Sequence, residues 1–321
     1  MSHRFCVAPM MDRTDRHERY FLRTLSKEML LYTEMIHANA VIHGNKDDLL
    51  KYHTSEHPLA IQLGGSNADD LLEASLIAEE KGFDEINLNV GCPSPRVQSG
   101  SFGAVLMKQP YLVRDCLKLL VENTNIPVTV KCRIGVDEMD EDKDLDKFVQ
   151  IVKDSGCKTF IIHARKAWLK GLSPKDNREI PPLNYERVYR LKDSFPDLEV
   201  IINGGIETTH DALGHLKRVD GVMVGRSAYD NPYSLVNVDK EIYSQSNRIP
   251  SRAEILEGLL PYMENEIRNG NKLGYVTKHL MGLFKNTKNA KKARSTLANI
   301  DDGMYPIEKL NLLINETKEL C

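Results

Sequence analysis

The sequence predicts a (β/α)8 barrel, or TIM barrel, followed by a small all-helical domain. Eight short apolar runs recur between Phe5 and Gly225, with segments of helical length between them. Polar or small residues stand at the carboxyl end of nearly every run, and no further run of this kind follows Pro232. Apolar runs that alternate with helices are typical of a parallel sheet, and eight such units close a barrel.

The eight apolar runs are the predicted strands. In chain order they are Phe5–Met10, Leu30–Met35, Leu59–Leu63, Glu85–Val90, Val128–Arg133, Thr159–Ala164, Val200–Asn203 and Gly221–Gly225. Between them, segments such as Ala68–Lys81 and Leu145–Ser155 have the apolar periodicity of helices. A doubly wound open sheet is the alternative fold. The number of units and the positions of the polar residues favour the barrel.

The polar and small residues at the strand ends predict where the active site lies. They are Pro9, Met10, Met11, Gln62, Asn87, Asn89, Lys131, Arg133, His163, Arg165, Asn203, Gly204, Gly205, Gly225 and Arg226. In a parallel barrel the carboxyl ends of the strands converge on one face, and active sites lie on that face.

The pattern after Pro232 predicts a second, helical domain. We place the boundary between residues 234 and 250, so that residues 1–235 form the barrel and residues 245–321 the helical domain. Ser251 and Glu254 have the spacing of a capping box, Pro261 should kink the helix that follows, and Asn269–Gly270 should end it. Three further helices are expected at Tyr275–Asn286, Ala290–Ala298 and Ile307–Leu320.

The helical domain carries a strongly basic segment. Residues 267–300 hold eight Lys and Arg residues and no Asp or Glu, so this window is +8 in a chain of net charge −3. The rest of the chain is therefore −3 − 8 = −11. Such asymmetry is typical of a surface that binds a polyanion. A solvated helical face is the alternative interpretation.

Composition excludes several classes of protein. No run of 18 or more apolar residues occurs, which excludes a transmembrane helix, and no signal peptide is seen, so we expect a cytoplasmic protein without a membrane partner. No two cysteines form a C-x-x-C pair, so neither a zinc nor an iron–sulfur site is expected. We expect a monomer, and reduced thiols at Cys6, Cys92, Cys116, Cys132, Cys157 and Cys321.

Several strand ends together favour a flavin nucleotide. Glycines after the last two strands let backbone N–H groups approach a phosphate at the usual phosphate site of a barrel, where Arg226 adds charge. Lys131 would stabilise the anionic reduced flavin, and His163 and Gln62 would hydrogen-bond the ring or its ribityl phosphate tail. The apolar segment from Pro9 to Met11 would pack on the ring, which favours FMN over a sugar phosphate.

Cys92 follows the fourth strand in a loop stiffened by Pro93 and Pro95. A cysteine is most often a buried structural residue, but a Pro-flanked cysteine at a barrel rim is unusual. Beside a reduced flavin, a thiol has one clear use. If hydride adds from flavin N5 to C6 of a uracil ring, C5 must receive a proton. An ordinary thiol, with a pKa of about 8.5, is still protonated at neutral pH and can supply it. NADPH would share the open flavin face as reductant, since no separate GxGxxG fingerprint occurs.

These residues resemble the dihydrouridine synthase family across the whole barrel. The matching segments are APMMDRTD (8–15), IQLGG (61–65), NLNVGCPSPRVQSGSFGAVLM (87–107), VKCRIG (130–135), IHARKAWLKGLSPKDNREIPPL (162–183), INGGI (202–206) and VGRSAYDNP (224–232). The segment that contains His163 and Arg178 resembles the A subfamily. Where the family tends to have Asp, this chain has Pro95.

The resemblance implies reduction of a uridine to 5,6-dihydrouridine at position 20 or 20a of the tRNA D-loop, with FMN as cofactor and NADPH as reductant. It implies Cys92 as the proton donor. The implied FMN contacts are Pro9, Met10, Met11, Gln62, Lys131, His163, Asn203, Gly204, Gly205, Gly225 and Arg226. The implied tRNA contacts are Asn89, Arg165, Lys175, Arg178, Lys291 and Arg294. The basic helical domain would then grip the phosphate backbone while the target base is turned out into the barrel.

Two other functions use the same residues differently. A flavin barrel that acts on a free small molecule, such as a dihydroorotate or enone oxidoreductase, shares the flavin site but has no use for the basic window. A tRNA-binding protein with a vestigial barrel would use the basic window without chemistry.

Overall fold

A computed structural model describes residues 2–302 and 305–319 of the chain. Eight parallel strands form a closed barrel in which each strand pairs with the next and β8 pairs with β1. The strands are β1 (Phe5–Val7), β2 (Leu30–His37), β3 (Leu59–Gly64), β4 (Glu85–Val90), β5 (Val128–Arg133), β6 (Thr159–His163), β7 (Glu199–Asn203) and β8 (Gly221–Val224). The predicted TIM barrel is confirmed.

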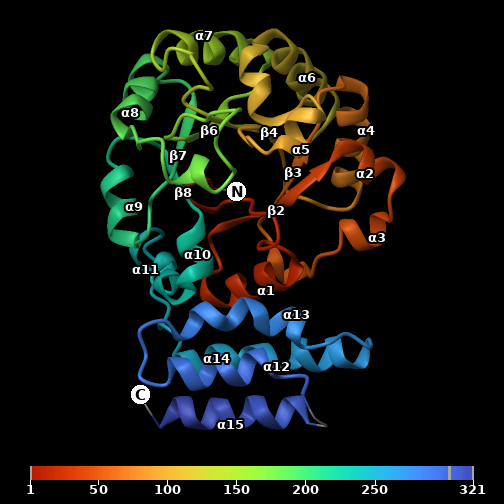
Figure 1. Ribbon diagram of the computed structural model, residues 1–321, viewed down its shortest axis with the longest axis vertical. Helices are drawn as coiled ribbons and strands as arrows, with labels where there is room; N and C mark the ends of the chain where they lie inside the picture. The colour runs from red at the N-terminus through yellow and green to blue at the C-terminus, as the bar shows by residue number, and fades with distance from the viewer. Residues whose placement is uncertain (1, 303–304, 320–321) are drawn as a thin grey trace.

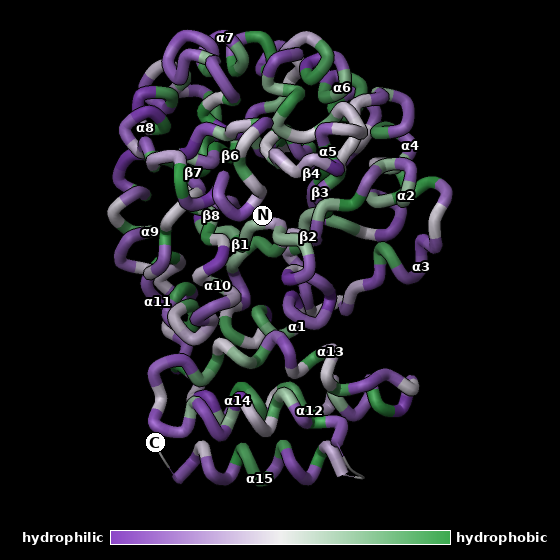
Figure 2. The backbone as a smooth tube through the Cα atoms, viewed as in Figure 1, coloured by the Kyte–Doolittle hydropathy of each residue, from purple (hydrophilic) through white to green (hydrophobic). Residues whose placement is uncertain are grey.

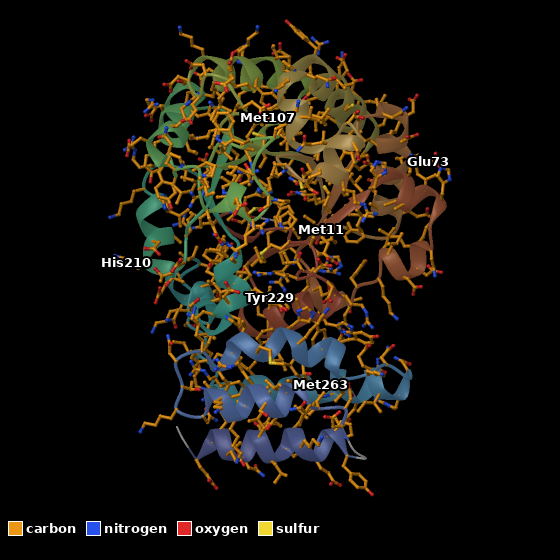
Figure 3. All side chains as sticks on the ribbon, viewed as in Figure 1. Met11, Glu73, Met107, His210, Tyr229 and Met263 are labelled. Atoms are coloured by element: carbon orange, nitrogen blue, oxygen red, sulfur yellow. The ribbon has the colours of Figure 1, made fainter. Side chains whose placement is uncertain are left out.

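The first strand is shorter than the sequence predicted. The N–H of Ala8 still donates to the carbonyl of Val224 at 2.8 Å, but the next residue is Pro9, which has no N–H to continue the ladder. The chain therefore leaves the sheet at Pro9. Met10 and Met11 consequently lie in a loop at the carboxyl end of β1, where Met11 is 55% exposed (Figure 3).

Helices surround the strands (Figure 1). Around the barrel lie α1 (Arg16–Leu25), α2 (Ala38–His43), α3 (Lys46–Leu49), α4 (Ala68–Glu80), α5 (Pro95–Ser99), α6 (Pro110–Asn123), α7 (Lys143–Val152), α8 (Tyr185–Ser194), α9 (Thr209–His215), α10 (Arg226–Asp230) and α11 (Val238–Glu241). Hydrophobic residues gather along the strands and hydrophilic ones along the outer helices (Figure 2). The strands are thus buried on both faces, as expected for an all-parallel sheet.

The chain after Pro250 forms a helical layer at the side of the barrel, next to α1 and α10 (Figure 1). Its helices are α12 (Arg252–Arg268), α13 (Gly274–Thr277), α14 (Ala290–Ala298) and α15 (Pro306–Lys318). The capping box of Ser251 and Glu254 and the helix over Ala290–Ala298 are confirmed. The last predicted helix, Ile307–Leu320, is confirmed as far as Lys318, and Leu320 lies outside the described residues. Within the described part of the chain, no helix is long and apolar enough to cross a membrane.

One predicted helix of this layer was wrong in type. The segment Tyr275–Asn286 is not a single α-helix, because α13 ends at Thr277 and a 3₁₀ helix covers Lys278–Phe284. The backbone passes very close to α10 here: a β-carbon on Gly282 would lie 2.4 Å from the carbonyl oxygen of Tyr229. Tertiary packing, rather than helix propensity, therefore sets the conformation of this segment.

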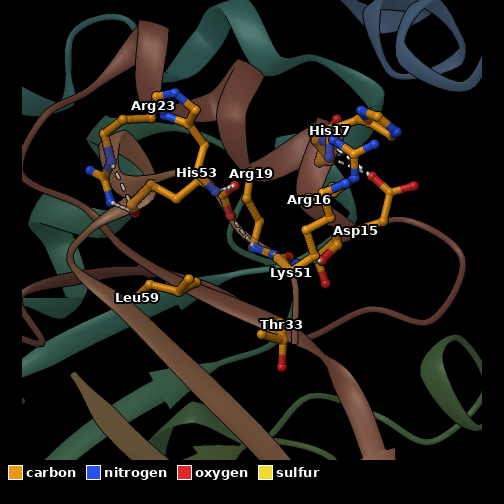
Figure 4. Close-up of polar contacts among 12 residues, drawn as sticks. Asp15, Arg16, His17, Arg19, Arg23, Thr33, Lys51, His53 and Leu59 are labelled. Atoms are coloured by element: carbon orange, nitrogen blue, oxygen red, sulfur yellow. Dashed lines mark hydrogen bonds and ion pairs between the residues drawn. The ribbon is translucent and has the colours of Figure 1, made fainter. Parts of the chain in front are cut away.

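Helix α1 fastens the helical layer to the barrel (Figure 4). The guanidinium of Arg16 forms a two-pronged pair with Glu266 of α12, at 2.6 and 2.7 Å, and His17 lies 2.8 Å from the hydroxyl of Tyr262. Arg19 of the same helix pairs with the buried Glu56 at 2.7 Å. A planar guanidinium on a carboxylate fixes both distance and angle. The basic segment is therefore held in a defined position relative to the barrel.

The beginnings of the strands enclose a buried ionic cluster. His3 lies between two carboxylates, with Nε2 2.5 Å from Glu85 and Nδ1 2.9 Å from Glu199. Burial alone would lower the pKa of His3, but the hydrogen bonds and charges of Glu199 and Glu85 outweigh it and raise this pKa to about 10. His3 is therefore a cation at neutral pH and offsets the buried carboxylate of Glu85 and the half-buried one of Glu199.

This cluster predicts a dependence of stability on pH. A histidine whose pKa is raised by folding stabilises the fold in full below its unfolded pKa, about 6.5, and this stabilisation is lost as pH rises through about 10. We expect His3→Gln to lower the melting temperature strongly at pH 6, and the difference from the parent protein to shrink by pH 10. Thermal denaturation from pH 6 to pH 10 measures this difference in melting temperature, and His43→Gln, at an exposed histidine, is the control. A difference that grew with pH would contradict the assignment.

Candidate active site

The carboxyl ends of the strands bring the predicted polar residues together. In the barrel register Asn89 lies beside Lys131, and His163 lies beside both Arg133 and Asn203. The ammonium of Lys131 donates to the side-chain oxygen of Asn203 at 3.1 Å, across two strands. The amide of Asn203 in turn donates to the carbonyl of Met223 in β8 at 2.7 Å. The predicted residues of β4 to β8 thus line one opening.

This opening is strongly cationic, which shifts the ionisation of its residues. Burial, together with the charge of Arg133, lowers the pKa of Lys131 to about 8. Burial and the charges of Arg133, Lys131, Arg165 and Arg178 lower the pKa of His163 well below its ordinary value. At neutral pH the site therefore contains a charged ammonium and a neutral imidazole. An anionic ligand is favoured by this field.

The Cys92 loop is rigidly held. The backbone N–H groups of Cys92 and Gly91 donate to the side-chain oxygen of Asn89, at 3.0 and 3.1 Å respectively. The carbonyl of Cys92 accepts from the N–H of Ala104 at 2.9 Å. Gly103 has a φ of +74°, and a β-carbon there would lie 2.6 Å from the Cys92 carbonyl oxygen, so only glycine fits. The thiol is partly exposed at the rim of the barrel.

The residues after Cys92 explain how two prolines fit in this loop. Pro93 is buried, and Pro95 occupies the first position of α5, where a missing N–H costs nothing. Gln98 of α5 donates to the carbonyls of Pro93 and Leu169, both at 2.8 Å. The four other described cysteines are free and buried, and Cys321 lies outside the described residues. Among the described cysteines, only Cys92 reaches the surface of the site.

Arg133 is one of the strand-end residues that the sequence predicted at the active site, but the sequence reasoning gave it no role of its own. Its buried guanidinium donates to the carbonyl of Gly91 at 2.9 Å and to the carbonyls of Lys166 and Asn177 at 3.0 Å. It therefore joins the Cys92 loop to the long loop between β6 and α8. Burial lowers the pKa of Arg133 to about 10, which leaves it charged at neutral pH. The only signal in the sequence was a second cation two residues after Lys131.

The loop between β6 and α8 places three predicted tRNA contacts beside the opening. Its fold depends on the buried Asn177, whose side chain bonds to both backbone groups of Trp168, at 2.7 and 2.9 Å. Lys175 and Arg178 project from this loop and are exposed. Arg165 lies at its base, where its guanidinium donates to the carbonyls of Pro181 and Glu179. These three residues lie on the barrel side of the molecule.

The predicted glycines are of two kinds. Gly204 and Gly205 have φ values of +118° and +69°, and β-carbons there would collide with His163 and Leu183. Glycine is required at both positions by the backbone itself. At Gly225, in contrast, an added β-carbon would meet no atom within 4 Å. The next residue, Arg226, is exposed and pairs with Glu179 at 2.8 Å.

The remaining predicted tRNA contacts lie apart from the opening. Lys291 and Arg294 are exposed on α14, in the helical layer (Figure 1). All eight basic residues of the 267–300 window are exposed. Two of them are ion-paired, Lys278 with Asp15 at 3.0 Å and Lys292 with Glu316 at 2.6 Å.

Comparison with known proteins decides the family. The family model described as dihydrouridine synthase matches residues 6–318. The chain belongs to the dihydrouridine synthase family. The resemblance predicted from the motifs is thus confirmed, and the chain is a dihydrouridine synthase, a flavin-dependent oxidoreductase.

Three curated relatives of this dihydrouridine synthase are named tRNA-dihydrouridine(20/20a) synthase. The protein of Synechocystis is 56% identical over 91% of this chain and 87% of its own length. The protein of Vibrio parahaemolyticus is 51% identical over 95% of this chain and 97% of its own length. The protein of Escherichia coli K12 is 53% identical over 92% of this chain and 86% of its own length.

A solved structure of a 2-naphthoyl-CoA reductase complex also matches this dihydrouridine synthase. It has a TM-score of 0.57, 8% identity, and coverage of 74% of this chain and 50% of its own. At that identity the likeness concerns the fold alone.

Proposed function

We propose that this dihydrouridine synthase reduces uridine 20 or 20a in the D-loop of tRNA to 5,6-dihydrouridine, with FMN as cofactor and NADPH as reductant. The observation that carries the proposal is the placement of Cys92. A partly exposed thiol stands on a rigid loop at the rim of the barrel, beside a cationic opening. The relatives named tRNA-dihydrouridine(20/20a) synthase support the substrate.

The residues around the opening fit FMN. The open space beside Gly225 and the positive φ angles of Gly204 and Gly205 leave backbone groups free to approach a phosphate, at the usual phosphate site of a barrel. Arg226 would supply charge there if it exchanges Glu179 for the phosphate. Lys131 would lie near N1 and C2=O, and the other predicted contacts, Pro9, Met10, Met11, Gln62, His163 and Asn203, would surround the ring and its tail.

The chemistry that FMN supplies when bound is transfer of a hydride from N5 to C6 of the base. The protein must then deliver a proton to C5, and we assign this proton to the Sγ of Cys92. Lys131, Arg133 and Arg178 bring positive charge close to Cys92. Asn89 holds the backbone at Cys92 and has a second amide N–H for the base.

The charge distribution supports tRNA as the partner. We propose that residues 1–235 form the catalytic domain and residues 245–321 a tRNA-binding domain. Lys291 and Arg294 would then contact the phosphate backbone from the helical side, and Arg165, Lys175 and Arg178 from the barrel side. We also propose that the protein acts as a monomer in the cytoplasm.

The direct test of the function is a map of dihydrouridine in tRNA from cells that lack this protein. We expect dihydrouridine to disappear at positions 20 and 20a and to remain at other D-loop positions. Purified protein with FMN and NADPH should restore it on that tRNA. Equal activity on free uridine would instead favour a small-molecule oxidoreductase. A protein that binds tRNA but is colourless, and whose spectrum NADPH does not bleach, would favour the vestigial barrel.

The open space at Gly225 gives a test of the cofactor. Gly225→Ala places a methyl group where no protein atom lies within 4 Å, so the fold should tolerate it. If FMN occupies that space, its affinity should fall by a factor of about 5 to 160, since overpacking a tight site costs about 1–3 kcal/mol. Fluorescence titration of FMN measures the loss. Gly214→Ala, which also meets no atom within 4 Å, is the control. Unchanged FMN binding would place the cofactor elsewhere.

A further inference from the structure

A row of buried polar side chains runs up the inside of the barrel, through β3, β4 and β5. It begins at Glu85, where β4 starts, and ends at Asn89, next to the Cys92 loop. Between them lie Thr129, Asn87 and Gln62. None of the five is more than 8% exposed. Buried polar groups of this kind are costly unless each finds a partner, so an unbroken row needs an explanation.

Each member of the row is bonded to the next. The Thr129 hydroxyl donates to Glu85 Oε1 at 2.6 Å, and Asn87 Nδ2 donates to Thr129 Oγ1 at 2.8 Å. Gln62 Nε2 donates to Asn87 Oδ1 at 2.7 Å, and Asn89 Nδ2 donates to Gln62 Oε1 at 2.8 Å. Asn89 Oδ1 then accepts the N–H groups of Gly91 and Cys92. Every donor in the row points away from Cys92 and toward Glu85.

The two ends of the row dictate this direction. A carboxylate can only accept, so Thr129 must donate to Glu85 and must accept from Asn87. Asn87 then presents its oxygen to Gln62, and Gln62 presents its oxygen to Asn89. At the other end a backbone N–H can only donate, so Asn89 must present its oxygen to the loop. Only one orientation of the three amides satisfies both ends, and it is the one observed.

We propose that Glu85, Thr129 and Asn87 are positioning residues that orient the Asn89 amide and thereby hold the backbone of Cys92 in its reactive place. This inference rests on the proposed function, because it assigns the row a purpose in the protonation step. None of the three reaches the opening. They act through Gln62 and Asn89, by fixing which side of each amide carries the donor.

The base of the row is itself firmly anchored. Glu85 Oε1 also accepts from the hydroxyl of Tyr32 at 2.7 Å, and its Oε2 lies against His3. The alternative acceptor for Thr129, the carbonyl of Ile86, is 3.5 Å away, far longer than the 2.6 Å to Glu85. The direction of the first bond in the row is therefore well determined. Removal of the Thr129 hydroxyl breaks the row at that bond and leaves Asn87 free to turn.

The chain offers a matched control for that removal. Thr159 of β6 is also buried, and its hydroxyl also donates to a carboxylate that contacts His3, since it bonds to Glu199 at 2.7 Å. It has no place in the row that leads to Cys92. Thr129→Val and Thr159→Val therefore each remove a hydroxyl that donates to a carboxylate beside His3, at a buried bond for Thr129 and a partly buried one for Thr159. Thr129→Ser, which keeps a hydroxyl, is the rescue variant.

Two readouts on the purified holoenzyme test the proposal. In Thr129→Val we expect hydrogen exchange at the amides of Gly91 and Cys92 to quicken about tenfold, the effect of losing about one hydrogen bond. We expect kcat on tRNA to fall roughly tenfold, with KM for tRNA within about twofold, since a misplaced acid slows chemistry without weakening binding. Thr129→Ser and Thr159→Val should resemble the parent protein in both.

Each other outcome would overturn the proposal. If Thr129→Val matches Thr159→Val in both readouts, the row does not position the loop. Faster exchange with unchanged kcat would make the row purely structural. If Thr129→Val does not fold, Asn87→Ala breaks the row at its next member and is judged by the same readouts. Failure of the proposed function is distinguishable, because Cys92→Ala would then keep its activity while amide exchange still responds to Thr129→Val.

Discussion

Replacement of Cys92 with alanine is expected to lower the reduction of uridine in tRNA by a factor of about 10²–10⁴, the usual contribution of a positioned acid. Flavin content and the oxidation of NADPH should stay unchanged, because the predicted FMN contacts all come from other residues. The decisive measurement is the rate at which tRNA reoxidises the NADPH-reduced enzyme in a single turnover. That rate isolates the step in which the base accepts hydride and proton.

The control for this experiment is Cys116→Ala. Cys116 is a buried cysteine of α6, on the outside of the barrel, and its thiol lies 3.7 Å from the carbonyl of Ser66. Its loss should cost some stability and leave single-turnover reoxidation within about twofold of the parent rate. Cys92→Ala that turned over as fast as Cys116→Ala would mean that the proton comes from another group.

The barrel could be predicted from the sequence because each strand is buried on both faces. A strand of this kind is usually a short run rich in apolar residues, and the predicted bounds of Glu85–Val90 and Val128–Arg133 match the structure although every second residue of Glu85–Val90 is polar. The strand ends could be predicted for the same reason, since a polar residue stands out against such a run. Lys131 and His163 were identified in this way, and the structure brings them to one opening.

Other features could not be predicted, because they depend on closure of the barrel. Arg133 contacts backbone groups 42, 33 and 44 residues away, and nothing local indicates that its side chain turns toward Gly91. The bonds of Glu85 to His3 and Thr129 likewise join residues 82 and 44 apart. A charged residue at the start of an apolar strand was the available signal. Apolar spacing also cannot separate a 3₁₀ helix from an α-helix over seven residues, as Lys278–Phe284 shows.

We infer that two kinds of contact serve the protonation step of the proposed reaction. The first is hydrogen bonding: Asn89 accepts from the backbone N–H groups of Gly91 and Cys92, and Arg133 donates to the carbonyl of Gly91, which fixes the backbone of the loop. The second is the positive charge that Lys131 and Arg178 bring close to Cys92, to which Arg133 adds its own. A variant of Thr129 should alter the first without the second.

The second large effect is a loss of tRNA affinity, and we expect it when two basic residues of α14 are replaced. Lys291 and Arg294 are exposed there, and neither lies within ion-pair distance of a carboxylate among residues 2–302 and 305–319. If each neutralises one phosphate, the double variant Lys291→Ala with Arg294→Ala should bind tRNA roughly 40-fold more weakly at 0.1 M salt. The slope of log K against log salt should become shallower by about 1.6, because each lost contact removes about 0.8. Filter binding over a range of salt concentrations gives both numbers.

A double variant on the outer helices of the barrel separates local contacts from net charge. Lys118 of α6 and Lys147 of α7 are exposed, and these helices lie at the end of the molecule opposite the helical layer (Figure 1). Lys118→Ala with Lys147→Ala removes the same two charges, so a long-range effect would weaken tRNA binding equally in both variants. We expect the parent affinity and salt slope in this control. Because the predicted FMN contacts all come from the carboxyl ends of the strands, flavin content should be unchanged in both. If only the α14 variant loses tRNA affinity, the basic window contacts the phosphate backbone of tRNA. If the affinity of the α14 variant is unchanged, the basic window is a solvated helical face.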